Sequence, residues 1–166
     1  VNDAPIIDII ADQSIDEDSS LTITLSASDI DSGDLTFSAS NGDSEIVVDG
    51  ATLTITPPAN YFGSEDVTVT VTDGELSDSA VFALTVNPVN DAPTLDDLSD
   101  ASVDEDNVYT LELSGADVDY DPLTFLASVE ENGSASIDGS TLTVTPAADF
   151  NGDLTVNIIA SDGQAS

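Results

Sequence analysis

The chain of 166 residues is 40% hydrophobic, which supplies enough apolar side chains for one or two small domains. Its 34 acidic residues have no Lys, Arg or His to pair with, and the formal net charge of −34 excludes nucleic acids and anionic membranes as partners. Cysteine is also absent, so each carboxylate must face water, accept hydrogen bonds or bind a metal ion without help from thiolates.

Alternating apolar and hydroxyl side chains predict half-buried β-strands in the first half of the chain. Residues 21–25 read LTITL and residues 67–71 read VTVTV, which places the apolar side chains on one strand face. Turns rich in Gly, Asp, Asn and Pro separate the segments. Seven strands are predicted, near residues 6–10, 20–27, 34–40, 45–48, 52–56, 66–72 and 80–86. Seven short strands are typical of a β-sandwich, and Tyr61, Phe62 and Phe150 are expected to fill its core.

The sequence repeats itself after about one domain length. Residues 1–5 (VNDAP) recur unchanged at 89–93, and residues 52–57 (TLTITP) recur as TLTVTP at 141–146. A repeat of this size predicts two domains, residues 1–88 and residues 89–166.

The second repeat is expected to lack its last strand. Only four residues follow Asp162, whereas Asp73 in the first repeat is followed by the predicted strand 80–86. An unpaired strand edge is costly and invites pairing with another chain. Two interpretations stay open: the sequence stops before that strand, or an identical subunit donates the strand.

Acidic and amide side chains gather in short clusters that indicate a cation. Calcium takes six to eight oxygen ligands from carboxylates, amides and backbone carbonyls. A single Asp-x-Asp pair is more often a solvated turn. Several clusters occur together, however, and favour a metal site: Glu17, residues 73–75 (DGE), residues 87–91 (NPVND) and residues 117–119 (DVD).

These motifs resemble those of cadherin repeats. Residues 29–33 (DIDSG) look like the Asp-x-Asp-x-Gly motif, and residues 73–75 are similar to the Asp-x-Glu motif. Residues 87–93 (NPVNDAP) resemble the Asp-x-Asn-Asp-Asn-Ala-Pro linker, in wording closer to the cadherin-like repeats of bacterial RTX-type adhesins. The resemblance covers nearly the whole chain. It implies an all-β fold of two tandem cadherin-like or Ig-like, seven-stranded Greek-key β-sandwiches, the second without its last strand.

The resemblance also implies calcium sites between consecutive domains. The central junction would take its ligands from both repeats and the linker: Glu17, Asp73, Glu75, Asn87, Asn90, Asp91, Asp117 and Asp119. A site with a preceding domain would use Asn2, Asp3, Asp29 and Asp31, and a site with a following domain would use Glu105 and Asp162. The match is imperfect, because Asn87 stands where the family has aspartate and Gln164 replaces the glutamate that corresponds to Glu75.

The function expected from these features is that of a stalk. Calcium would neutralise converging carboxylates and stiffen an extracellular bacterial surface adhesin, with neighbouring repeats of the same polypeptide as partners. The alternative is a subunit of a self-assembling extracellular filament, completed by strand donation. No enzyme activity is expected, because His and Cys are absent and the acidic pairs repeat with the domains instead of marking one cleft. No apolar stretch approaches the roughly 20 residues that span a bilayer, so membrane insertion is not expected.

Overall fold

The computed structural model describes residues 1–31 and 33–166; Ser32, which the predicted Asp-x-Asp-x-Gly motif includes, lies outside the described residues. All regular structure in the described ranges is β-strand, which confirms the predicted fold class. The chain divides into unit 1, Val1–Val89, and unit 2, Asn90–Ser166. The boundary falls one residue after the predicted one, since the Val89 N–H donates a 2.5 Å hydrogen bond to Glu17 Oε1 within unit 1.

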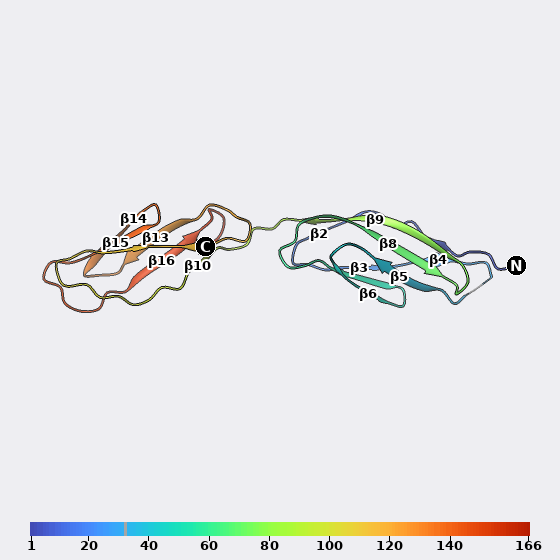
Figure 1. Cartoon of the computed structure of the whole chain (residues 1–166), viewed down its shortest axis with the longest axis horizontal. Helices are drawn as coiled ribbons and strands as arrows, with labels where there is room; N and C mark the ends of the chain where they lie inside the picture. The colour runs from blue at the N-terminus through green and yellow to red at the C-terminus, as the bar shows by residue number, and fades with distance from the viewer. Residues whose placement is uncertain (32) are drawn as a thin grey trace. The chain divides into compact units, whose positions relative to one another are not determined.

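The strands of unit 1 form two sheets and one separate two-stranded pair (Figure 1). One sheet has the order β2-β9-β8-β5, the other β3-β7-β6, and β1 pairs separately with β4. The strands are β1 (Ile6–Ile7), β2 (Gln13–Asp16), β3 (Leu21–Thr24), β4 (Ala27–Ser28), β5 (Thr36–Ser40), β6 (Glu45–Asp49), β7 (Thr52–Thr56), β8 (Gly63–Thr72) and β9 (Ser77–Asn87).

The strand β2 was not predicted from the sequence. It has only four residues, and it pairs in parallel with β9, from Gln13 opposite Leu84 to Asp16 opposite Asn87. Its existence therefore depends on a partner about seventy residues away, which a local pattern does not reveal.

The core of unit 1 follows the predicted alternation. Val67, Val69 and Val71 of β8 are fully buried, and Phe82 and Leu84 of β9 pack with them. The intervening threonines of β8 face outward because successive side chains of a strand point to opposite faces. A cluster of eleven buried apolar residues results.

One aromatic prediction was wrong. Tyr61 packs against the core of unit 1, but the neighbouring Phe62 is 55% exposed. Adjacent residues of an extended segment point to opposite sides, so only one of this pair can face the core. In unit 2, Phe150 is half-buried.

Unit 2 repeats the arrangement with fewer strands. Its sheets are β11-β15-β14 and β13-β16, and β10 pairs with β12. In residues 90–166 no strand corresponds to β2 or β9 of unit 1. The strands are β10 (Thr94–Leu95), β11 (Tyr109–Glu112), β12 (Gly115–Ala116), β13 (Thr124–Val129), β14 (Gly133–Asp138), β15 (Thr141–Pro146) and β16 (Val156–Ser161).

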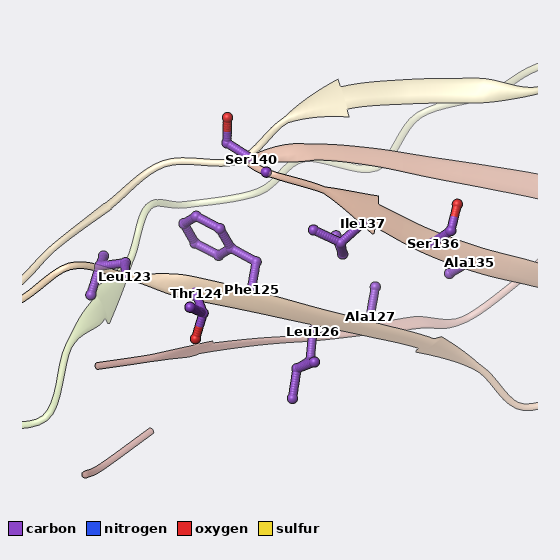
Figure 2. Close-up of a pocket in the computed structure, with 10 residues that line it drawn as sticks. Leu123, Thr124, Phe125, Leu126, Ala127, Ala135, Ser136, Ile137 and Ser140 are labelled. Atoms are coloured by element: carbon purple, nitrogen blue, oxygen red, sulfur yellow. The ribbon is translucent and has the colours of Figure 1, made fainter. Parts of the chain in front are cut away.

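The core of unit 2 is small and opens into a cavity. Its buried cluster contains Leu113, Leu142 and Val144. A cavity of about 570 Å³ lies between β13 and β14. Figure 2 shows Phe125 and Ile137 directed into this space, whereas Leu126 points away from it. At the position of Ile46 in unit 1, unit 2 has Ala135, whose small side chain leaves the space unfilled.

Candidate metal sites

Each unit gathers oxygen-rich side chains at the end where its chain begins. In unit 1 they come from the segment before β1, the loop after β4 and the β8–β9 turn; we call Asn2, Asp3, Asp29, Asp31 and Asp73 the N-terminal cluster of unit 1. The corresponding N-terminal cluster of unit 2 comprises Asn90, Asp91, Asp117, Asp119 and Asp162. Sequence segments about seventy residues apart thus meet at one end of each sandwich.

Hydrogen bonds connect the three segments of the unit 1 cluster. Asn2 Nδ2 donates to Asp73 Oδ2 over 2.8 Å, and the Asp3 N–H donates to Asp31 Oδ2 over 2.9 Å. The Asp31 N–H in turn donates to Asp29 Oδ1 over 2.7 Å. The N-terminal segment is therefore fixed to both acidic loops.

Unit 2 reproduces this network bond for bond. Asn90 Nδ2 donates to Asp162 Oδ2 over 2.8 Å, and the Asp91 N–H donates to Asp119 Oδ2 over 2.8 Å. The Asp119 N–H donates to Asp117 Oδ1 over 2.9 Å. The recurrence indicates that the arrangement belongs to the repeat and not to one unit.

One carboxylate in each cluster also organises the turn that carries it. Asp73 Oδ1 accepts 2.7 Å bonds from the N–H groups of Glu75 and Leu76. The Leu76 and Glu75 N–H groups, followed by the Asn2 amide, lower the pKa of Asp73. In unit 2 the pKa of Asp162 is lowered by the Ala165 N–H, then by the Asn90 amide and the Gln164 N–H.

Asp117 is the carboxylate whose surroundings fit a cation. Its Oδ1 accepts bonds from the N–H groups of Asp119 and Asp121, at 2.9 and 3.3 Å. Its Oδ2 is buried and has no hydrogen-bond partner among the residues described. A buried carboxylate oxygen without a donor is costly, and the sequence has no basic side chain to approach it.

The acidic side chains are not gathered as a ready-made metal centre. Within the ranges 1–31 and 33–166, no three acidic side chains lie close enough together to hold a metal ion. Several of their oxygens are instead engaged by backbone N–H groups, as at Asp31 and Asp119. A bound cation would have to compete with these bonds or use the remaining oxygens.

Glu17 lies at the opposite end of unit 1, where its chain leaves the sandwich. It is only 5% exposed, and its N–H donates a 2.9 Å bond to the Asn87 carbonyl. Asn87 Nδ2 is 3.1 Å from Ser14 Oγ and 3.2 Å from Asp16 Oδ1. This C-terminal end of unit 1 is therefore held by β2 and the loop after it.

The predicted grouping of Asp73 and Glu75 with Glu17 was wrong. Asp73 lies in the turn before β9, and Glu17 lies beside the last residue of β9. At about 3.3 Å per residue, the eleven residues of β9 separate these ends by roughly 30 Å. Glu75 is exposed, next to the N-terminal cluster of unit 1.

The grouping of Asp162 with Glu105 was also wrong. Asp162 follows β16, whereas the loop of Glu105 is bonded to the segment before β16 through the Asp149 N–H, which donates a 3.0 Å bond to Asp106 Oδ1. Asp162 belongs to the N-terminal cluster of unit 2 through Asn90, whereas Glu105 is exposed in the loop before β11. Gln164, which replaces the glutamate corresponding to Glu75, has a role that the sequence analysis missed: its Nε2 donates a 2.7 Å bond to Asn90 Oδ1. Its place two residues after Asp162, in the same turn, is the signal that could have revealed this role.

The fold and the duplicated clusters define a tandem β-sandwich repeat of the Ig class. Residues 2–85 and 90–166 each match the profile of the bacterial Ig domain family, so the chain belongs to that family. The protein is 33% identical over 133 residues to chitinase A of Pseudoalteromonas piscicida. This match covers 77% of the chain but only 16% of the chitinase.

Several solved structures are similar in fold. Human protocadherin-24 EC1-2 is 15% identical with a TM-score of 0.47, and the match covers 97% of this chain and 94% of that one. The titin domains z1z2 are 16% identical with a TM-score of 0.43, over 99% and 92% of the two chains. The endo-fucoidan hydrolase MfFcnA4 is 20% identical with a TM-score of 0.43, over 95% of this chain and 28% of the hydrolase.

The described residues include no helix that is long and apolar enough to cross a membrane.

Proposed function

We propose that this chain is a calcium-binding, non-catalytic Ig-repeat segment that extends a bacterial surface adhesin or a similar extracellular protein. The observation that carries the proposal is the buried Asp117 Oδ2, which has no hydrogen-bond partner among the described residues. With no Lys, Arg or His in the sequence, a metal cation is the available positive charge. Oxygen donors of the carboxylate and amide type are those that calcium prefers.

The residues that would hold calcium belong to one unit at a time. In unit 2 the buried Oδ2 of Asp117 would be the first ligand. Asp119, Asp162, Asp91 and the Asn90 amide would have to move closer to complete the set, because no three acidic side chains of the described residues lie close enough together as they stand. The matching bonds in unit 1 support an equivalent site there. When bound, calcium would supply positive charge that offsets the repulsion among the carboxylates.

Separate observations support the proposed extracellular location and the proposed non-catalytic role. Extracellular modules bind calcium with dissociation constants of roughly 10⁻⁴ to 10⁻³ M, which suits extracellular fluids and not the cytosol. The similarity to part of a chitinase is compatible with a spacer inside a longer secreted protein, because it covers a small share of that enzyme. The chain itself has no His or Cys to act as general base or thiol nucleophile.

Calcium titration by calorimetry on the whole chain tests the proposal. We expect binding in the range of roughly 10⁻⁴ to 10⁻³ M. The substitution Asp117→Asn should abolish the heat from the unit 2 site, because it puts an amide in place of the buried oxygen. The matched control is Asp138→Asn, an exposed acid on β14, which should leave the titration unchanged. Equal heats for the parent and the Asp117 variant would contradict the proposal.

The stiffening role predicted from the sequence requires a separate measurement. Small-angle scattering of the chain in millimolar calcium and in chelator should show larger mean dimensions with calcium, and a narrower distribution of them. Unchanged dimensions would exclude stiffening by calcium. They would not bear on calcium binding, which the calorimetry tests separately.

A further inference from the structure

The sequence contains three Asn-Gly pairs, at residues 41–42, 132–133 and 151–152. The backbone nitrogen that follows an Asn can attack its side-chain amide, and Gly in that place has no Cβ to hinder the attack. Such pairs are therefore candidate sites of spontaneous covalent modification. The first two pairs lie at equivalent places, the β5–β6 connection of unit 1 and the β13–β14 connection of unit 2. The third has no counterpart in unit 1, where Phe62 replaces the asparagine.

In unit 1 the amide of Asn41 is held by a carboxylate. Asn41 Nδ2 donates a 3.0 Å hydrogen bond to Glu65 Oε1, which also accepts a 2.5 Å bond from Ser44 Oγ. Before this amide can turn toward the Gly42 nitrogen, it must break a bond to a charged acceptor, which is stronger than a bond between neutral groups. The contact with Glu65 therefore opposes attack at Asn41.

In unit 2 the amide of Asn132 has no such acceptor. Leu154, beside Gly133, takes the place of Glu65, and its side chain cannot form hydrogen bonds. Asn132 is exposed, and its φ of 63° lies in the left-handed region that Asn tolerates better than most residues. Its amide can therefore turn toward Gly133 without breaking a bond of the kind that holds Asn41.

The strand ladder leaves the attacking nitrogen of Gly133 accessible. The Ala147 N–H donates a 2.8 Å bond to the Asn132 carbonyl, and the next residue, Gly133, lies opposite Pro146. Pairs in an antiparallel ladder alternate between hydrogen-bonded and non-hydrogen-bonded, so the Gly133–Pro146 pair is of the second kind. The Gly133 N–H therefore points away from β15. Because β14 is the edge strand of the sheet β11-β15-β14, no other strand of that sheet among the described residues lies on this side.

We propose that Asn132 is a site of spontaneous deamidation and that Glu65 protects Asn41 from the same reaction. The Gly133 nitrogen attacks Asn132 Cγ and forms a new C–N bond. The Cγ–Nδ2 bond breaks, and the amide nitrogen leaves as ammonia with the proton from the Gly133 nitrogen. Water then opens the succinimide ring at either carbonyl and gives aspartate or isoaspartate. Water is the only co-reactant, and no residue of the N-terminal cluster of unit 2 takes part.

The modification changes the connection that carries it. Each event replaces an uncharged amide by a carboxylate, in a chain whose 34 acidic residues already have no basic partner. Isoaspartate also inserts a methylene group into the backbone, which displaces the carbonyl that the Ala147 N–H bonds. We therefore expect the pairing of β14 with β15 to loosen at this end, with faster hydrogen exchange of the Ala147 amide.

Incubation of the whole chain at mildly alkaline pH, which helps the Gly nitrogen to lose its proton, tests the proposal. Digestion with pepsin and mass spectrometry then follow each site, since the chain has no Lys or Arg for trypsin. Asn132 should be converted at least about tenfold faster than Asn41, with both aspartate and isoaspartate as products. The internal control is Asn157, an exposed Asn on β16 that precedes Ile158 and should stay intact. Equal rates at Asn41 and Asn132, or aspartate as the sole product, would overturn the proposal.

Substitutions of Glu65 test its protective role. Glu65→Leu gives unit 1 the residue of unit 2 and should speed the conversion of Asn41 by about tenfold or more. Glu65→Gln keeps an uncharged acceptor of the same shape and should give an intermediate rate, which covers the case in which Glu65→Leu disturbs the fold. The matched control Glu45→Ala, at an exposed position of β6, removes the same charge and should leave the rate unchanged. An Asn41 rate that neither substitution of Glu65 alters would refute the protection.

Discussion

Unit 1 and unit 2 carry the same motifs and the same N-terminal cluster, yet their cores differ greatly. Both clusters repeat the same hydrogen bonds within about 0.2 Å. Among the described residues, the packed cluster of buried apolar side chains has eleven members in unit 1 and three in unit 2. The loops at the N-terminal end therefore form the same contacts in both units, whereas the extent of the buried core differs with β2 and β9, which unit 1 contains.

A second difference concerns the contact between the start of β8 and the segment before β6, which we call the corner of unit 1, and the equivalent contact in unit 2. This contact is polar in unit 1 and apolar in unit 2. In unit 1, Glu65 Oε1 accepts bonds from Asn41 Nδ2 at 3.0 Å and from Ser44 Oγ at 2.5 Å. In unit 2 the position of Glu65 is taken by Leu154, beside Gly133. A Cβ on Gly133 would lie 3.0 Å from the Thr145 carbonyl oxygen and 3.4 Å from Leu154, so glycine permits this close approach.

The largest expected effect comes from breaking the strand that distinguishes the units. Phe82 is 1% exposed, and Phe82→Ala should lower the free energy of unfolding of unit 1 by about 3–5 kcal/mol. Unit 2 should keep its stability, because Phe82 lies in the other unit. Chemical denaturation followed by hydrogen exchange would resolve the two units. Val81→Ala, at a 59% exposed position of the same strand, is the control and should cost less than about 0.5 kcal/mol.

Ile46 of unit 1 and Ala135 of unit 2 occupy equivalent positions, and exchanging them should reduce the difference in stability between the two cores. Ile46 packs against the core of unit 1, and Ile46→Ala should cost about 2–4 kcal/mol. In unit 2, Ala135→Ile fills part of the cavity in Figure 2 and should add about 1 kcal/mol. Denaturation midpoints of the two single variants measure both effects. A destabilised Ala135→Ile variant would mean that the cavity walls cannot accommodate the larger side chain.

The polar corner of unit 1 should contribute less than the core. Glu65→Ala removes the acceptor of Asn41 and Ser44, and we expect a loss of about 1–2 kcal/mol. Glu45→Ala, at an exposed position of β6, is the matched control for loss of a negative charge. Equal denaturation midpoints for Glu65→Ala and Glu45→Ala would contradict a stabilising contribution from the hydrogen bonds of Glu65.

The smallest expected effect concerns the pH dependence of the N-terminal clusters. The folded-state pKa of Asp73 lies below its ordinary value of 3.8, so its contribution to stability is complete above that value and is lost as pH falls through the folded pKa. Asn2→Ala removes one stabilising donor and should raise the pKa of Asp73 without changing that of Asp162. Carbon-detected NMR titration of both carboxyl groups measures this. A shift at both sites would contradict independent clusters.

The local pattern of the sequence predicted most strands and the repeat, because alternation of apolar residues and turn chemistry are visible within a few residues. It did not reveal β2, whose pairing partner is distant, or which end of the sandwich each acidic loop occupies. The second failure misplaced Asp73 and Asp162, since the direction of the adjacent strand, β9 after Asp73 and β16 before Asp162, decides which loops share an end. The bonds from Asn2 and Asn90 show the true neighbours, and those contacts join segments far apart in the sequence.

The parallel pairing of β2 with β9 has a mechanical consequence. If the two ends of unit 1 are pulled apart, β2 is drawn toward the start of the unit and β9 toward its close. The ladder between Gln13–Asp16 and Leu84–Asn87 is then loaded in shear, and its bonds must rupture together instead of unzipping one by one. A domain with this clamp resists tension along its length.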